Sequence, residues 1–297
     1  MVSMIQIPGG TLLMGSEEFY PEEGPVHERE VAAFELDEHP VTNEAYASFV
    51  RDTGYVTVAE RAMDPADYPG VHPDDLVPGA MVFTATNGPV DLRDWRHWWR
   101  WEPGAHWRHP FGLDSSIDAR MDHPVVHIAY PDAAAYAAWA GKRLATEAEW
   151  EWAARGGLVG ARYAWGDDVR PDGVVMADTW QGEFPYLNTG AAGWVGTAPV
   201  GMFPANGYGL YDMIGNVWEW TDDYWMHRHT VPGAVAVDAG QRPSLLSAEP
   251  GSRIPRRVLK GGSHLCAPEY CLRYRPAARS AQAEDTAMTH IGFRCAR

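Results

Sequence analysis

The pattern of apolar and polar positions predicts a chain with a few short helices among many turns. Residues 42–53 carry apolar side chains at helical spacing, between Thr42 as an N-terminal cap and Gly54 as a terminator. An alanine-rich helix is predicted to open at Pro131-Asp132 and to stop at Gly141. Both helices are bounded by residues that favour helix ends, so local sequence is sufficient to predict them.

A third helix is predicted by Thr146-Glu147-Ala148-Glu149, which matches a capping box. In this motif the hydroxyl of Thr146 and the carboxylate of Glu149 each accept a hydrogen bond from a backbone amide of the first turn. The helix is expected to run to about Arg155 and to end at Gly156-Gly157.

The rest of the chain shows only short apolar pieces between turns. Two examples are residues 125–128 and 258–260, whereas residues 60–116 show no clear period. No repeat, low-complexity tract or obvious linker divides the sequence. We therefore expect one α+β domain over residues 1–297.

Composition favours a turn-rich globular fold. The 30 Gly and 23 Pro residues are more than an average chain of this length carries. The 14 Trp, 13 Tyr and 8 Phe residues supply too much aromatic surface for a disordered chain. The sequence is long enough to bury a large core.

Charge argues against a nucleic-acid partner. The chain has 24 basic and 40 acidic side chains, for a formal net charge of −16, and phosphate binding needs clustered Lys and Arg. The tryptophan-rich run at residues 95–101 is therefore a poor candidate for a single-strand stacking platform. Two other interpretations stay open for it: aromatic packing on a loop-rich surface, and the wall of a peptide groove.

The sequence carries no sign of export or of membrane insertion. The first ten residues have neither a basic start nor an apolar run before turn residues appear. No stretch approaches the roughly 18 apolar residues that span a bilayer. We expect a cytoplasmic, reducing environment and no membrane partner.

Three cysteines lie in the last part of the chain, and they are the clearest candidates for chemistry. Cys266 and Cys271 are on a stretch that is opened by two glycines and interrupted by a proline, while Cys295 stands apart. Because the number is odd, at least one thiol is unpaired. The spacing of Cys266 and Cys271 is compatible with a disulfide or redox pair, with inert buried thiols, or with a nucleophilic or metal site. As metal ligands, two thiolates suit a soft ion such as Cu(I) better than Zn(II), which would want four ligands.

Asp212 and Glu219 form a second candidate site. They flank a turn that contains Gly215, and carboxylates combined with main-chain carbonyls are typical Ca²⁺ ligands. The alternative is a tight turn whose carboxylates face water.

These segments, taken in order, resemble the formylglycine-generating enzymes, also called sulfatase-modifying factors. The resemblance covers roughly residues 5–295. The shared segments are Ile7-Pro8-Gly9-Gly10-Thr11-Leu12-Leu13-Met14-Gly15-Ser16, Val41-Thr42-Asn43, His123-Pro124-Val125-Val126-His127, Trp139-Ala140-Gly141-Lys142-Arg143-Leu144, Thr146-Glu147-Ala148-Glu149-Trp150-Glu151, Gly215-Asn216-Val217-Trp218-Glu219-Trp220, Lys260-Gly261-Gly262-Ser263 and Gly292-Phe293-Arg294-Cys295.

Most of these motifs belong to a broad superfamily and mainly identify a fold. The more specific signals are the two cysteines of residues 266–271, the following residues 273–279, and residues 104–110. The fold that the resemblance implies is a variant of the C-type lectin-like fold with little regular secondary structure.

The resemblance also implies a reaction. Members of this family oxidise one cysteine in a Cys-x-Pro-x-Arg segment of an unfolded sulfatase to Cα-formylglycine (3-oxoalanine), with O₂ as the oxidant, and so activate type I sulfatases. By resemblance, Cys266 and Cys271 would hold Cu(I), and the substrate thiolate would join as a third sulfur. Ser263, Trp218 and Tyr270 match positions that line the pocket. Arg279 matches an arginine close to the site, with a catalytic and a structural role both open.

Calcium ligands are implied unevenly. At one family site Asp212 and Glu219 match side-chain ligands, and Gly215 and Val217 match carbonyl ligands. At the other site Asp178, Thr179 and the carbonyl of Trp194 match. Ala192 stands where the family often has Asp, which would weaken that second set.

Secreted relatives carry structural cysteines at positions that are Ala137, Ala154 and Pro276 here. Cys295 is therefore expected to be unpaired, as suits a reducing compartment. We also expect a monomer.

Two other functions are compatible with such a scaffold. An iron-dependent sulfoxide synthase would need an additional helical domain that supplies histidine ligands, and we expect no room for one. A lectin-like module that only binds would have no need of both Cys266 and Cys271.

Overall fold

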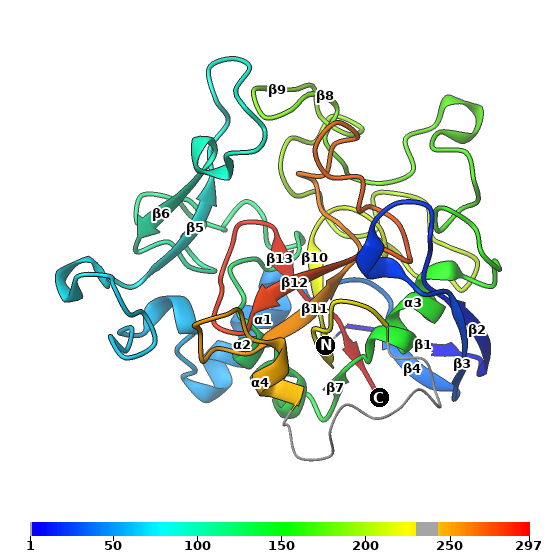
Figure 1. The fold of residues 1–297 in the computed structure, drawn as a ribbon, viewed down its shortest axis with the longest axis horizontal. Helices are drawn as coiled ribbons and strands as arrows, with labels where there is room; N and C mark the ends of the chain where they lie inside the picture. Colours follow the sequence, from blue (N-terminus) through cyan, green and yellow to red (C-terminus); the bar gives the residue numbers. More distant parts are fainter. Residues whose placement is uncertain (1, 230–242) are drawn as a thin grey trace.

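The computed structural model describes residues 2–229 and 243–297 (Figure 1). All three predicted helices are present: α1 (Asn43–Thr53), α2 (Tyr130–Trp139) and α3 (Glu147–Arg155). A short helix that was not predicted, α4 (Pro243–Ser247), precedes the last strands. The described residues also form five 3₁₀ turns: η1 (Pro21–Glu23), η2 (Val58–Glu60), η3 (Pro73–Asp75), η4 (Trp95–His97) and η5 (Pro171–Gly173).

The helix ends form as their sequences predict. The Thr42 hydroxyl accepts from the amide of Ala45 at 3.2 Å, and Gly54 closes α1 in the left-handed conformation. At α3 the capping box is complete, because Thr146 accepts from the Glu149 amide at 3.2 Å and Glu149 accepts from the Thr146 amide at 2.8 Å. Helix α2 begins one residue earlier than predicted, with proline in its first turn.

Two four-stranded sheets form the centre of the molecule. The first has the order β1 (Met4–Ile7), β4 (Phe34–Asp37), β14 (Cys295–Ala296) and β7 (Arg143–Leu144), so the two ends of the chain lie in one sheet (Figure 1). The second, which we call the central sheet, has the order β12 (Arg279–Ala283), β11 (Arg256–Lys260), β10 (Trp218–Tyr224) and β13 (Ile291–Gly292).

Three two-stranded ribbons surround these sheets. They are β2 (Gly10–Met14) with β3 (His27–Val31), β5 (Gly79–Phe83) with β6 (Trp99–Pro103), and β8 (Gly182–Glu183) with β9 (Leu187–Asn188). The β5–β6 ribbon lies in the region where the sequence showed no period, and in Figure 1 it stands away from the central sheet. Its pairing joins residues that are about twenty positions apart, which a local pattern does not reveal.

The main core lies between α1, α2, α3 and the sheets. Tyr46 of α1 and Tyr136 of α2 are fully buried against Phe293, and Trp150 of α3 is buried against the central sheet with its indole N–H on Glu219 at 2.8 Å. The many turns and short strands confirm an α+β fold with little regular secondary structure. No helix among residues 2–229 and 243–297 is long and apolar enough to cross a membrane.

Candidate active site

The two candidate cysteines are brought together by a tight loop. The Cys266 amide donates to the Ser263 carbonyl at 2.9 Å, and the Cys271 amide donates to the Ala267 carbonyl at 2.7 Å. These turns place the two Sγ atoms 3.1 Å apart, and both thiols are free rather than joined in a disulfide. The structure therefore shows two free thiols, and not the disulfide that was one interpretation of the spacing.

Both thiols line a cavity of about 220 Å³, here called the cysteine cavity. The other described residues that line it are Trp98, Trp99, Phe184, Trp218, Ser263, Leu265, Tyr270, Arg273, Ser280 and His290. The predicted pocket residues Ser263, Trp218 and Tyr270 thus lie with the two cysteines.

The central sheet positions much of this cavity. Trp218 opens β10, Ser263 follows the end of β11, and Ser280 is the second residue of β12. Lys260 of β11 lies opposite Glu219 of β10 and Arg279 of β12. The ends of these three strands that carry the cavity residues therefore lie side by side. The amide of Leu265 donates to the Ser263 hydroxyl at 3.2 Å, which fixes that oxygen in place.

Aromatic rings form one wall of the cavity. Tyr270 stacks on Phe184 with ring centres 4.5 Å apart and meets the buried Trp98 edge to face at 5.2 Å. Trp99 packs against His290 at 4.8 Å. For these two tryptophans the groove-wall interpretation of the run at residues 95–101 is supported, whereas Trp95 and Trp101 are exposed at the surface.

The two thiols have different electrostatic environments. Burial raises the pKa of the Cys266 thiol well above its ordinary value. The hydrogen bond from Cys266 lowers the pKa of Cys271 to about 7, and the guanidinium of Arg273 acts in the same direction. Cys271 is therefore the more readily ionised of the two thiols.

Arg273 also lines the cavity, although the sequence indicated it only as part of the family-specific segment 273–279 and predicted no role for it in the site. Its Nη2 donates to Glu22 Oε1 at 2.7 Å, and its guanidinium lies 3.9 Å over the ring of Tyr20. The Tyr20 hydroxyl also accepts from the amide of Leu272 at 3.1 Å. The segment around η1 thus holds the residues that follow Cys271.

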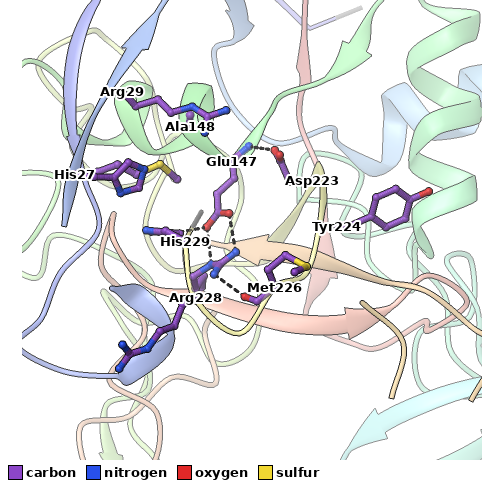
Figure 2. Close-up of a pocket in the computed structure, with 11 residues that line it drawn as sticks. His27, Arg29, Glu147, Ala148, Asp223, Tyr224, Met226, Arg228 and His229 are labelled. Atoms are coloured by element: carbon purple, nitrogen blue, oxygen red, sulfur yellow. Dashed lines mark hydrogen bonds and ion pairs between the residues drawn. The ribbon is translucent and has the colours of Figure 1, made fainter. Parts of the chain in front are cut away.

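Arg279 does not line the cysteine cavity. Successive side chains of a strand point to opposite faces, so Ser280 faces the cysteine cavity and Arg279 faces away from it. Arg279 instead lines a separate cavity of about 120 Å³ together with Glu147 and His229, which Figure 2 shows with the contacts of Glu147. The arrangement supports the structural one of the two roles left open for Arg279.

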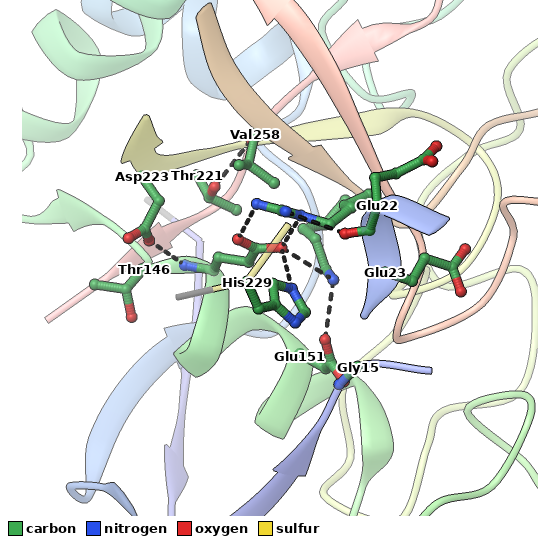
Figure 3. Close-up of polar contacts among 12 residues, drawn as sticks. Gly15, Glu22, Glu23, Thr146, Glu151, Thr221, Asp223, His229 and Val258 are labelled. Atoms are coloured by element: carbon green, nitrogen blue, oxygen red, sulfur yellow. Dashed lines mark hydrogen bonds and ion pairs between the residues drawn. The ribbon is translucent and has the colours of Figure 1, made fainter. Parts of the chain in front are cut away.

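Arg279 belongs to a buried ion network with Glu147, Lys260 and Glu151. Figure 3 shows polar contacts in this region, with Glu151 labelled. Arg279 Nη2 donates to Glu147 Oε2 at 2.8 Å, and Lys260 Nζ lies 3.1 Å from Glu151 Oε2 and 3.7 Å from Glu147 Oε1. Glu151 also accepts from the amide of Gly15 at 2.9 Å. These contacts fix the ends of β11 and β12, which carry Ser263 and Ser280 to the cysteine cavity.

The cysteine cavity fits a soft monovalent ion. Its lining contains two sulfur donors and no Asp or Glu, and Cu(I) accepts as few as two soft ligands. Among residues 2–229 and 243–297 there is no group of three or more His, Cys, Asp or Glu side chains that could hold a metal. A zinc site with four side-chain ligands is accordingly not found in the described chain.

Two of the predicted calcium residues carry unsatisfied buried oxygens. Asp178 Oδ2 and Asp212 Oδ1 lack hydrogen-bond partners within the described chain. Burial raises the pKa of Asp178 well above its ordinary value, the charge of Asp212 raises it further, and burial raises the pKa of Asp212 to about 6. The sequence predicted a separate calcium site for each of these residues, which stays a prediction; in the structure the charge of Asp212 acts on Asp178, and two such carboxylates fit an oxygen-binding cation.

Gly215 explains this proximity. It has a φ of +80°, and a Cβ at this position would lie 2.3 Å from the Asp178 carbonyl oxygen. The amide of Asn216 donates to the same carbonyl at 2.8 Å. The turn that carries Asp212 is therefore pressed against the backbone of Asp178.

The remaining predicted calcium residues already have partners or lie in the core. Glu219 accepts from Arg294 Nε at 2.8 Å and from Trp150, so its charge is balanced without a metal. The Trp194 carbonyl accepts from the Ala191 amide at 2.9 Å, and the Thr179 hydroxyl accepts from Gln181 at 3.0 Å. Val217 is buried in the core.

Comparison with known proteins shows what kind of protein carries this arrangement. The sulfatase-modifying factor enzyme 1-like domain matches residues 1–297. The formylglycine-generating enzyme of Mycobacterium tuberculosis is 62% identical over 296 residues, which cover 99% of this chain and 97% of that protein. The chain belongs to the formylglycine-generating enzyme family. The predicted family, the family fold and the assignment as an oxidoreductase of sulfatase maturation are thereby confirmed.

Two further comparisons qualify the family assignment. The mouse protein named inactive Cα-formylglycine-generating enzyme 2 is 37% identical and covers 99% of this chain and 85% of its own length. The structure of PvdO from Pseudomonas aeruginosa has a TM-score of 0.65 at 24% identity, covering 100% of this chain and 94% of that one, and shows the fold alone. The assignment of individual site residues therefore depends on the cysteine cavity itself.

Proposed function

We propose that this chain oxidises the cysteine of a Cys-x-Pro-x-Arg segment in an unfolded sulfatase to Cα-formylglycine, with O₂ as the oxidant and Cu(I) on Cys266 and Cys271. The observation that carries the proposal is the pair of free thiols 3.1 Å apart in a cavity of about 220 Å³. A substrate side chain as small as that of cysteine fits a cavity of this size.

The residues around Cys266 and Cys271 have different proposed roles. When bound, Cu(I) supplies the one-electron chemistry with O₂ that no protein side chain provides. Trp218, Tyr270 and the other aromatic residues exclude water from the reacting sulfur. The Ser263 hydroxyl accepts from Leu265, so its own O–H is left to donate into the cavity.

The main alternative is a lectin-like module that binds without catalysis. That a family relative is named inactive makes the alternative worth testing. A module that only binds has no evident need of two free thiols that face each other inside a cavity. Cys295, by contrast, is a single thiol buried in the core. The geometry therefore favours the enzyme.

We further propose that Ca²⁺ binds at the Asp178 and Asp212 carboxylates, with main-chain carbonyls of the neighbouring turns. The unpartnered oxygens of these two acids support this assignment. Gly215 and Val217 are the proposed carbonyl ligands beside Asp212, and Thr179 and Trp194 those beside Asp178. The ion pair of Glu219 with Arg294 limits what Glu219 could add.

Three free thiols suit a reducing compartment, and we propose a cytoplasmic protein that works as a monomer on unfolded sulfatase chains. Cys295 is buried in β14, and the strands of its sheet, as the structure describes them, contain no other cysteine. Its thiol provides a control for the two cavity thiols.

The test is conversion of a synthetic peptide that contains Cys-Thr-Pro-Ser-Arg. The reduced protein is loaded with copper and incubated with the peptide in air, and the product is weighed and trapped with an aminooxy reagent. We expect the aldehyde with the wild-type protein and with Cys295→Ala, and no aldehyde with Cys266→Ala or Cys271→Ala. If folded, copper-loaded wild-type protein leaves the peptide unchanged, this substrate assignment is wrong.

A further inference from the structure

We propose that Arg273 is the counter-charge through which the cysteine cavity selects its substrate cysteine as a thiolate. This inference rests on the function proposed above and adds a residue that determines substrate affinity. It starts from the lining of the cavity, in which Arg273 is the one Lys or Arg among the described residues.

The charge balance of the cavity calls for such a group. Two cysteine thiolates around one Cu(I) carry a single negative charge in total, and a substrate thiolate would bring the total to two. Confining that charge in a cavity with an aromatic wall is costly unless a cation lies nearby. His290, the other basic side chain of the lining, is not that cation, because burial lowers its pKa well below the ordinary value and keeps it neutral.

Arg273 is held in place for this task. Arg273 Nη2 donates to Glu22 at 2.7 Å, and the guanidinium lies 3.9 Å over the ring of Tyr20. The buried Nε of Arg273 has no hydrogen-bond partner in the described chain. Glu22 does not line the cavity, whereas Arg273 does, so Arg273 is the charged member of this ion pair that belongs to the cavity lining. A planar cation that is fixed beforehand loses little conformational freedom when an anion arrives.

Arg273 lines the same cavity as the two cysteines. A substrate thiolate that enters this cavity therefore meets the guanidinium of Arg273, whereas a serine or alanine side chain has no charge to be stabilised. The expected signature of Arg273 is therefore a difference between cysteine and serine peptides rather than a general loss of binding.

The experiment measures peptide binding to the Cu(I)-loaded protein under nitrogen, where no turnover occurs. Two peptides are compared, with Cys-Thr-Pro-Ser-Arg and Ser-Thr-Pro-Ser-Arg at their centres, between pH 6 and 9. The proteins are wild type, Arg273→Met, Arg273→Gln, Arg273→Lys and, as a charge-removal control outside the cavity, Arg170→Met. Circular dichroism confirms that each variant is folded.

We expect Arg273→Met and Arg273→Gln to weaken binding of the cysteine peptide by about ten-fold or more, as expected for the loss of a charge a few ångströms away. Binding of the serine peptide should stay unchanged, and the pH at which the cysteine peptide begins to bind should rise. Arg273→Lys should restore most of the affinity, and Arg170→Met should behave as wild type.

Equal weakening of both peptides would show that Arg273 only supports the loop, and unchanged binding of the cysteine peptide would also overturn the inference. These results differ from a failure of the proposed function. In that case the wild-type protein would itself bind the cysteine peptide no better than the serine peptide.

Discussion

Arg279 donates from Nη2 to Glu147 Oε2 at 2.8 Å, and both side chains are almost fully buried. This pair connects α3 to β12, one residue before Ser280 enters the cysteine cavity. Lys260, which lies opposite Arg279 in the central sheet, approaches Glu147 from β11. The walls of the cavity thus depend on a network that never touches it.

Breaking this pair should destabilise the protein. We expect Arg279→Met and Glu147→Gln each to lower the free energy of unfolding by about 3–5 kcal/mol, because each removes one charge of a buried ion pair and leaves the other in place. Urea denaturation measures the change. The matched control is Arg297→Met, which removes an exposed ion pair with Glu35 and should cost less than about 1 kcal/mol. A loss of activity in Arg279→Met without any loss of stability would instead assign Arg279 a catalytic role.

The three thiols should differ in reactivity. At pH 7.5 we expect iodoacetamide to label Cys271 first, since its pKa of about 7 leaves most of it as thiolate and it is the least buried of the three. Cys266 and Cys295 should react much more slowly, because burial raises the pKa of both. Peptide mapping by mass spectrometry of the metal-free protein gives the order. Faster labelling of Cys266 would contradict the assignment of the thiolate to Cys271.

Calcium should stabilise the fold in a pH-dependent way. Burial raises the pKa of Asp212 to about 6, so the metal-free folded protein binds a proton that the unfolded chain, with an ordinary Asp pKa near 4, releases. Without metal, this residue therefore costs stability as the pH rises from about 4 to 6. Ca²⁺ takes the ionised form, so its stabilising effect should be present above pH 6 and be lost below it.

The measurement is the melting temperature in Ca²⁺ and in a chelator, at pH 7.5 and at pH 5. We expect a clear difference at pH 7.5 and little at pH 5, and Asp212→Asn should reduce the difference at pH 7.5. A calcium effect that is equal at both pH values, or that survives in both Asp178→Asn and Asp212→Asn, would rule out the proposed ligands.

The aromatic wall should tolerate loss of the Tyr270 hydroxyl better than loss of its ring. Tyr270→Phe keeps the stack on Phe184, whereas Tyr270→Ala removes it together with the contact to Trp98. We expect a loss of about 0.5–1.5 kcal/mol of stability from the stacking alone in Tyr270→Ala, and less in Tyr270→Phe. Comparing peptide oxidation in the two variants then separates the role of the hydroxyl from that of the ring. Oxidation that is lost equally in both variants would assign the effect to the hydroxyl.

The features that the sequence predicted correctly depend on residues that are close together along the chain. Thr42 and the Thr146–Glu149 capping box defined helix ends because their partners lie within one turn. Cys266 and Cys271 could be paired because the loop between them is short. The role of Arg273 in the cavity was not predicted, because its position depends on Glu22, which is 251 residues away in sequence. The close approach of the Gly215 turn to the backbone of Asp178 could not be predicted for the same reason, since the two segments are distant in sequence.

The most direct test of the central claim is X-ray absorption at the copper edge of the Cu(I)-loaded protein under nitrogen. We predict two sulfur ligands in the wild-type protein and in Cys295→Ala, no such centre in Cys266→Ala or Cys271→Ala, and a third sulfur when the Cys-Thr-Pro-Ser-Arg peptide is added. Copper bound through nitrogen or oxygen ligands, or a sulfur count that the peptide does not change, would contradict the account.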